Sequence, residues 1–194
     1  MKMTMIMAAT TLLARAAFGQ SWVEERTFVS DGQATPRMDA LVSGSLAKKL
    51  GATAWFQVQK NYSETWLAAT YSPKSWLQLG IGPGMEQYVA SDTKKIKSSA
   101  RIGSFAWVGN KRNSALFIAE DGGSGFWYKI EALHTFNRFF DAGFIEERYK
   151  GSGAELRFKI PHTPLAVWVA PMFSRYPASY RLHSSTLIGV RWSL

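Results

Sequence analysis

Apolar and polar residues alternate one by one along most of this chain, and this pattern constrains the fold more than any other feature. In the segment 154–160, Ala, Leu, Phe and Ile are interleaved with Glu, Arg and Lys, and the segments 52–59 and 126–132 alternate in the same way. Successive side chains of a β-strand point to opposite faces of the sheet, whereas a helix repeats about every 3.6 residues. The chain is therefore predicted to be all-β, with one apolar and one polar sheet face.

Gly, Pro, Asn, Asp and Ser interrupt the alternation about every dozen residues, and these are the residues that turns favour. The interruptions divide the chain into twelve predicted strands, which we expect to pair as an antiparallel, up-and-down sheet. The predicted strands are Trp22–Ser30, Met38–Lys48, Gly51–Lys60, Glu64–Tyr71, Ser75–Gly84, Lys97–Val108, Asn113–Asp121, Gly125–Phe136, Ala142–Lys150, Gly153–Pro161, Pro164–Phe173 and Ser184–Leu194. Eight or ten strands are the alternative counts.

The connections between these strands predict which kind of sheet they form. The three longest, near residues 31–37, 85–96 and 174–183, all fall on one side of an up-and-down sheet. Long external loops opposite short periplasmic turns are typical of transmembrane β-barrels, whose outer face is apolar and whose lumen is polar. We therefore predict a single transmembrane β-barrel. A soluble lipocalin-like binding barrel, with its apolar residues inside, is the competing fold.

The first residues indicate where the chain is located. Lys2 precedes an apolar run over residues 3–13, and Ala17 and Gly19 are small residues of the kind that signal-peptide cleavage requires. We predict a signal peptide over residues 1–19 and one barrel domain over residues 20–194, in the outer membrane of a Gram-negative envelope. The chain has no cysteine, which excludes disulfide frameworks and thiolate metal sites.

The alternation continues to the last residue of the chain. Ile188, Val190, Trp192 and Leu194 alternate with smaller or polar residues, and Gly189 precedes the last five. This ending resembles the C-terminal signal of bacterial outer-membrane β-barrels, with Gly189, Trp192 and Leu194 at the signal positions. The resemblance implies that the barrel-assembly machinery inserts the chain.

The strand count and the last strand are also similar to those of the monomeric acidic-oligosaccharide porins. That resemblance implies a passive channel that takes anionic sugars through a lumen lined by basic residues. We accordingly expect a porin-like pore for small anionic solutes, a monomer that contacts the bilayer and lipopolysaccharide and needs no cofactor, metal or nucleic acid. A closed structural or envelope-assembly barrel is the main alternative.

The polar register of the strands supplies the predicted lumen residues. The charged candidates are Arg101, Lys129, Glu131, Glu155, Arg157, Lys159 and Arg191, and the aromatic candidates are Trp55, Trp66 and Trp76. Basic residues outnumber acidic ones in this set. We therefore expect a modest preference for anions, because a ring of basic side chains in a narrow lumen lowers the barrier for them.

A short segment of the last strand supplies the enzyme alternative. The sequence His183-Ser184-Ser185 resembles the His-x-Ser arrangement of the outer-membrane lipid A deacylases, in which the histidine activates the serine. A lipid A-modifying hydrolase would use His183 and Ser185. No Asp or Glu follows them, so the acidic residue of that family has no counterpart here, and we expect no enzymatic activity.

Overall fold

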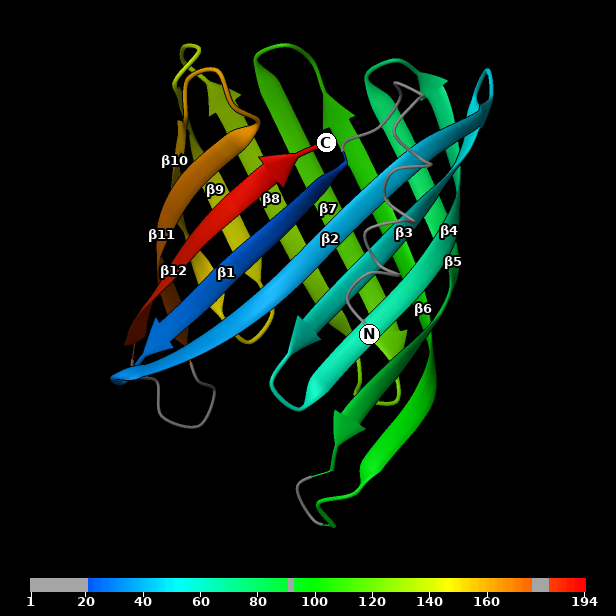
Figure 1. Cartoon of the computed structure of the whole chain (residues 1–194), viewed down its shortest axis with the longest axis vertical. Coiled ribbons are helices and arrows are strands. Elements are labelled where there is room, and N and C mark those ends of the chain that lie inside the picture. The colour runs from blue at the N-terminus through cyan, green and yellow to red at the C-terminus, as the bar shows by residue number, and fades with distance from the viewer. Residues whose placement is uncertain (1–20, 91–92, 176–181) are drawn as a thin grey trace.

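The computed structural model describes residues 21–90, 93–175 and 182–194, and these form one closed β-barrel (Figure 1). The strands are β1 (Trp22–Ser30), β2 (Gln33–Ala47), β3 (Leu50–Gln59), β4 (Tyr62–Lys74), β5 (Leu77–Val89), β6 (Ile96–Gly109), β7 (Asn113–Gly122), β8 (Trp127–Thr135), β9 (Phe140–Glu147), β10 (Gly151–Lys159), β11 (Leu165–Arg175) and β12 (Leu182–Ser193). Each pairs antiparallel with its neighbours in the sequence, and β12 pairs with β1. The predicted fold and the count of twelve strands are confirmed. The predicted signal peptide lies outside the described residues.

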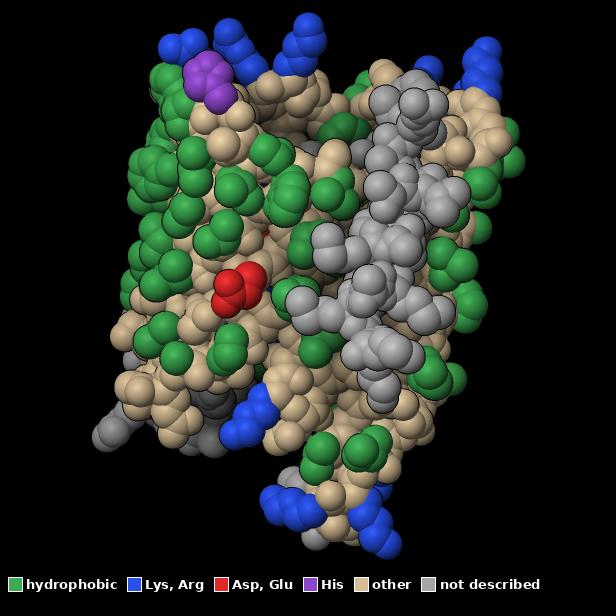
Figure 2. Space-filling view, in the orientation of Figure 1, with side chains coloured by type: hydrophobic (Ala, Val, Ile, Leu, Met, Phe, Trp, Pro, Cys, Tyr) green, Lys and Arg blue, Asp and Glu red, His purple; other side chains and the backbone are tan. Residues whose placement is uncertain are grey.

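The alternation of the sequence produces an inner and an outer surface. On β10, Glu155 and Arg157 are buried inside the barrel, whereas Leu156 and Phe158 are 39% and 53% exposed on its outside. Figure 2 shows apolar side chains in a broad band across the visible face, with Lys and Arg at the upper and lower rims. This is the arrangement of a barrel in a bilayer and the reverse of a lipocalin-like barrel, so the soluble alternative is wrong. Among the described residues, no helix has the length and apolar character needed to cross a membrane.

The first hairpin differs from the prediction. The expected connection 31–37 is a two-residue turn at Asp31 and Gly32, and β2 starts directly after it. Both residues have positive φ, 50° and 74°, which is the backbone of the hairpin turns that favour Asp-Gly. Pro36 consequently lies inside β2. Pairing with β3 begins only at Arg37, so Pro36 has a neighbouring strand on one side only, and such edge positions tolerate proline.

The other connections define the two ends of the barrel. We call the end with the connections after β1, β3, β5, β7 and β9 the outer end, and the end with Ser21 and Leu194 the inner end. The expected long connection 85–96 is shorter because β5 continues to Val89, and residues 176–181 of the third lie outside the described residues. The difference in loop length between the two ends is therefore smaller than the sequence predicts. The β5–β6 hairpin projects beyond the outer end, at the bottom of Figure 1.

Candidate functional site: the charged lumen

The inside of the barrel is lined with charged side chains, because every second residue of each strand points inward. Among the described residues, nine acidic and six basic side chains are buried. They are Glu24, Asp39, Glu64, Glu86, Glu120, Glu131, Asp141, Glu147 and Glu155, with Arg26, Arg37, Arg101, Lys129, Arg157 and Arg191. A buried charge is costly unless it is paired, and all of these side chains except Asp141 form three clusters of ion pairs.

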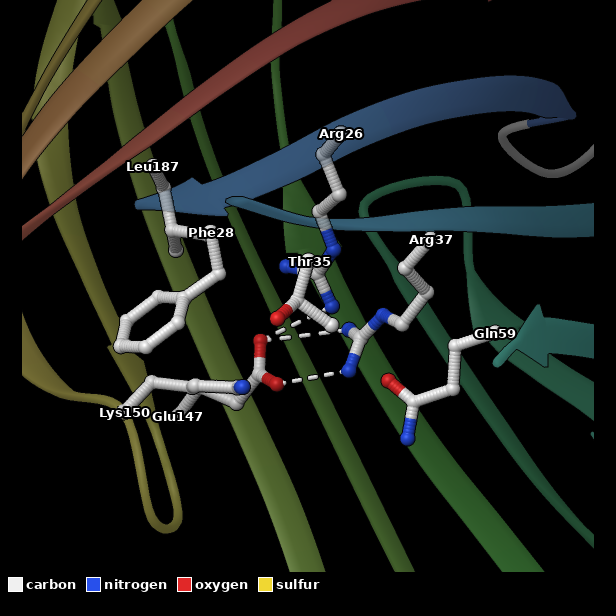
Figure 3. A pocket seen from close by; sticks show the side chains of 8 residues that line it. All are labelled: Arg26, Phe28, Thr35, Arg37, Gln59, Glu147, Lys150 and Leu187. Carbon is white, nitrogen blue, oxygen red and sulfur yellow. Dashed lines mark hydrogen bonds and ion pairs between the residues drawn. The ribbon is translucent and has the colours of Figure 1, made fainter. Parts of the chain in front are cut away.

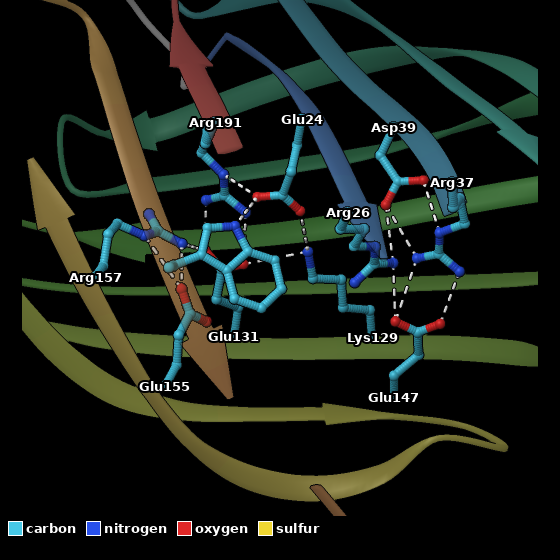
Figure 4. Close-up of polar contacts among 11 residues, drawn as sticks. Glu24, Arg26, Arg37, Asp39, Lys129, Glu131, Glu147, Glu155, Arg157 and Arg191 are labelled. Atoms are coloured by element: carbon cyan, nitrogen blue, oxygen red, sulfur yellow. Dashed lines mark hydrogen bonds and ion pairs between the residues drawn. The ribbon is translucent and has the colours of Figure 1, made fainter. Parts of the chain in front are cut away.

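The first, which we call the Glu131 cluster, joins β1, β8, β10 and β12 across the lumen (Figure 4). It consists of Glu24, Lys129, Glu131, Glu155, Arg157 and Arg191. Arg191 donates two hydrogen bonds of 2.7 Å to Glu131 and one of 2.5 Å to Glu24. Arg157 lies 3.2 Å from Glu131 and 2.5 Å from Glu155. Three basic groups therefore balance three acidic ones.

The second, the Arg37 cluster, joins β1 and β2 to β9 and consists of Arg26, Arg37, Asp39 and Glu147. Arg37 Nη1 lies 2.7 Å from Glu147 Oε1, and Arg26 Nη2 lies 2.8 Å from Glu147 Oε2. Figure 3 shows both guanidinium groups at this carboxylate. Asp39 forms ion pairs with the same two arginines at 2.8 and 2.9 Å, and Arg37 Nη2 donates a hydrogen bond of 3.0 Å to it. This cluster is also electrically balanced, and it crosses the lumen because β9 lies on the far side of the barrel from β2.

The third, the Arg101 cluster, has more acidic than basic groups. Arg101 of β6 lies 3.1 Å from Glu64, 2.5 Å from Glu86 and 3.0 Å from Glu120. Ser99 and Ser124 donate further hydrogen bonds to Glu86. One guanidinium thus serves three carboxylates, so this part of the lumen is more negative than the other two clusters.

A chain of aromatic rings crosses the lumen beside these clusters. Trp55 of β3 is completely buried, and its ring centroid lies 5.9 Å from that of Trp22, 6.2 Å from that of Trp66 and 6.4 Å from that of Trp127. The indole N–H of Trp55 donates to Glu64 at 2.9 Å. Because β3 and β8 lie on nearly opposite sides of the barrel, the contact between Trp55 and Trp127 spans the lumen.

Two glycines make room for large rings inside the barrel: Gly103 of β6 for Trp66 of β4, and Gly189 of β12 for Trp168 of the adjacent strand β11. A Cβ added to Gly103 would lie 2.4 Å from Cγ of Trp66, and one added to Gly189 would lie 2.5 Å from the ring of Trp168. Gly189 of the predicted C-terminal signal therefore has a packing role. The other two signal residues, Trp192 and Leu194, are more than half exposed, at 54% and 57%.

The structure places most of the predicted lumen residues inside the barrel. Six of the seven charged candidates belong to the buried set, and Lys159 lies at the inner end with a side chain 35% exposed, 2.6 Å from Asp141. Trp55 and Trp66 are buried in the lumen, but Trp76 is not: it lies in the turn between β4 and β5 and is 50% exposed. The strand predicted from Ser75 begins only at Leu77, so Trp76 precedes the alternating segment.

Two of the cavities lined by described residues are large, and they lie at opposite ends of the barrel. The outer vestibule has a volume of about 240 Å³, and its charged lining residues are Arg37, Arg101, Arg148, Lys150, Glu64 and Glu147. The inner vestibule has a volume of about 480 Å³, and its charged side chains are those of Arg157, Lys159, Arg191 and Asp141. Basic side chains outnumber acidic ones in both.

Burial lowers the pKa of Lys150, which lies in the β9–β10 turn, and the charge of Glu147 opposes this shift.

The two vestibules are separated by tryptophan. Trp127 lines the outer vestibule and Trp22 lines the inner one, and Trp55 contacts the rings of both. The Glu131 cluster lies beside these rings, with the guanidinium of Arg191 4.3 Å from the centroid of Trp22. Side chains that reach from one wall to the other therefore cross the lumen between the two vestibules.

The histidine and serine of the enzyme alternative lie on the lumen side of β12. Their odd-numbered register is that of the buried residues Leu187 and Arg191, whereas Ile188 and Val190 point outward. His183 and Ser185 therefore lie on the lumen face of β12, away from the apolar outer face. Among the described residues, no group of three or more His, Cys, Asp or Glu could hold a metal ion.

Comparison with known proteins identifies the fold. No family model and no curated protein sequence matches the chain. The solved KdgM porin in complex with disordered oligogalacturonate matches with a TM-score of 0.55 and 14% identity, over 89% of this chain and 99% of that one. The NanC porin matches with a TM-score of 0.55 and 11% identity, over 89% and 100%. Outer membrane phospholipase A from Escherichia coli matches with a TM-score of 0.52 and 10% identity, over 96% of each chain.

These likenesses extend over almost the whole chain at very low sequence identity, so they concern the fold alone. The similarity to porins expected from the strand count and the last strand is confirmed at that level. The chain has the fold of the outer-membrane β-barrels.

Proposed function

We propose that this chain is an outer-membrane channel of low conductance, closed at mid-lumen between two vestibules. The observation that carries the proposal is the position of Trp55, which contacts a ring of each vestibule and is itself completely buried. Among the described residues, the barrel interior also holds fifteen buried charged side chains, and an interior of this kind suits water and polar solutes. The similarity of the fold to porins, one of them solved with an oligogalacturonate, supports a channel.

We propose small anions as the preferred solutes, because of the basic residues in the vestibules and not because of those at mid-lumen. The lumen residues predicted from the sequence include five basic and two acidic side chains, but the buried set has nine acidic and six basic members. The basic excess lies instead in the two vestibules, where a solute enters. Because the Arg101 cluster is acidic, the resulting preference is modest.

A closed structural barrel is the second candidate, and the ion pairs favour it. The Glu131 and Arg37 clusters both span the lumen and are electrically balanced, and such networks hold a barrel interior in one arrangement. In a structural barrel these contacts never open. In a channel they part, or leave a passage for water beside them.

Replacing Trp55 distinguishes the two. In planar bilayers we expect the unmodified protein to give small or brief current steps, and Trp55→Ala to raise the conductance several-fold by connecting the vestibules. Trp76→Ala is the matched control, because Trp76 is a half-exposed turn residue outside the lumen. Absence of current steps in the unmodified protein, with none gained in Trp55→Ala, would leave the structural barrel standing and reject the channel.

A further inference from the structure

The turns at the inner end of the barrel carry charge of one sign. The described turns at this end contain no Asp or Glu; they are residues 48–49, 75–76, 110–112, 136–139 and 160–164. Asp141, also at this end, is buried and lies 2.6 Å from Lys159 of the inner vestibule. Basic residues in or beside the turns are exposed, and we call them the basic arc: Lys48, Lys49, Lys74, Lys111, Arg112 and Arg138.

The turns of the basic arc lie side by side along the rim. Ser72 N donates a hydrogen bond of 2.8 Å to Lys49 O, which joins the β2–β3 turn to β4. Gly109 N donates one of 2.9 Å to Trp76 O, which joins the β4–β5 turn to the end of β6. Like charges held so close together repel one another. An anionic partner at this rim would therefore relieve the repulsion.

The surroundings of the basic arc indicate its depth in the membrane. Trp76, Phe136 and Phe139 are exposed aromatic residues of the same turns, and the guanidinium of Arg138 lies 4.5 Å from the ring centroid of Phe139. Aromatic girdles of transmembrane barrels lie at the level of the lipid headgroups. Figure 2 shows Lys and Arg along the upper rim, directly above the apolar band. The arc therefore lies among headgroups, and this favours a lipid over a soluble polyanion.

We propose that the basic arc binds anionic glycerophospholipids, with its ammonium and guanidinium groups contacting the phosphodiester oxygens of the headgroups. A zwitterionic lipid also has a phosphate, but its own ammonium offsets the attraction. A headgroup of net negative charge gains from several neighbouring basic side chains at once. The long stems of Lys and Arg can lie along apolar surface while the charge stays among the headgroups. This binding does not depend on conduction, so it goes beyond the proposed channel.

Spin-labelled lipids test the proposal, because lipids in contact with a barrel move more slowly than bulk lipids and give a separate resonance signal. The unmodified protein is placed in phosphatidylcholine vesicles. We expect spin-labelled phosphatidylglycerol to associate with it several-fold more strongly than spin-labelled phosphatidylcholine. Combining Lys48→Gln, Lys49→Gln and Lys111→Gln should remove most of this preference. Heat-modifiable migration on gels verifies that the variant is folded.

The matched control removes the same number of charges at the other end of the barrel. It combines Lys60→Gln, Lys94→Gln and Lys95→Gln, which are exposed lysines between strands at the outer end, and it should keep the preference. Equal losses in the two variants would show that the net charge of the protein attracts the lipid, and this would overturn the proposal. Absence of a preference in the unmodified protein would also overturn it. Binding of soluble polyglutamate in that case would assign the arc to a soluble polyanion.

Discussion

At the scale of single residues, the imbalance of the Arg101 cluster has the largest expected effect on stability. Replacing Arg101 by Met leaves three carboxylates without their shared guanidinium, and uncompensated buried charges cost about 3–5 kcal/mol. We expect Arg101→Met to lower the free energy of unfolding by about that much in denaturant titrations followed by tryptophan fluorescence. Lys159→Met is the control, because this lysine is 35% exposed and exposed pairs contribute about 1 kcal/mol or less. Equal losses would contradict the assignment.

The inward or outward direction of a residue could be predicted from the sequence wherever its strand alternates clearly. Glu155 and Arg157 are examples. Arg37 was missed because residues 31–37 looked like a long connection, although the dipeptide Asp31-Gly32 is itself a hairpin signal. Asp39 lies in the predicted strand Met38–Lys48 but was not among the predicted lumen residues. The partners could not be predicted at all: which carboxylate meets Arg191 depends on the stagger of β8 against β12 across the lumen, and one sequence does not give the stagger.

At the scale of elements, two glycines are expected to resist replacement for different reasons. Gly32 in the β1–β2 turn has φ of +74°, and an added Cβ meets nothing within 4 Å. We therefore expect Gly32→Ala to lower the free energy of unfolding only by the penalty for a left-handed backbone, about 1–2 kcal/mol. Gly103→Ala forces the Trp66 ring to move, and overpacking costs about 1–3 kcal/mol. We expect unfolding titrations to show both losses, with the near-ultraviolet circular dichroism of tryptophan changed in Gly103→Ala alone. A tryptophan signal altered by Gly32→Ala as well would contradict this distinction.

Strand ends were harder to predict than strands. Alternation locates β10 to within two residues, because its outward side chains face lipid and its buried inward side chains Glu155 and Arg157 are charged. Alternation fails at the rims, because both faces of a strand meet water there and no longer select different side chains. For this reason β5 continues five residues beyond its predicted end, to Val89. The predicted difference in loop length between the two ends of the barrel depends on where the strands end at these rims.

At the scale of the whole molecule, the distribution of charge along the lumen predicts ion selectivity. Reversal potentials under a salt gradient, measured on Trp55→Ala where its currents are larger, should show a modest anion preference. It should fall with salt, because the Debye length shrinks from about 10 Å at 0.1 M to about 3 Å at 1 M. Lys150→Glu combined with Lys159→Glu should shift the preference toward cations, and Lys48→Glu, in a turn at the inner end, is the control. Cation preference before any charge is reversed would refute the role of the vestibules.

The pH dependence of that selectivity follows from Lys150. A lysine is charged below its pKa, and burial lowers the pKa of Lys150 from the usual 10.5. The anion preference should therefore weaken at a lower alkaline pH than an ordinary lysine would give, and Lys150→Arg, which stays charged, should abolish that early loss. An identical alkaline profile in Lys150→Arg would assign the change to another group.

The ion pairs of the lumen join residues that are very far apart along the chain. Glu24 meets Arg191 across 167 positions, and Arg37 meets Glu147 across 110. None of the contacts of Glu24 with Arg191 and Trp168 can exist while the nascent sheet is still open at the seam between β1 and β12. Closure of the seam and pairing of the lumen charges therefore occur together. Contacts between residues so far apart in the sequence form slowly, so we expect this closure to be the slow step of assembly. A chain arrested before its last strand would lack Arg191, so the Glu131 cluster would hold three carboxylates and only two basic groups, and this makes an unfinished barrel electrostatically distinct from a finished one.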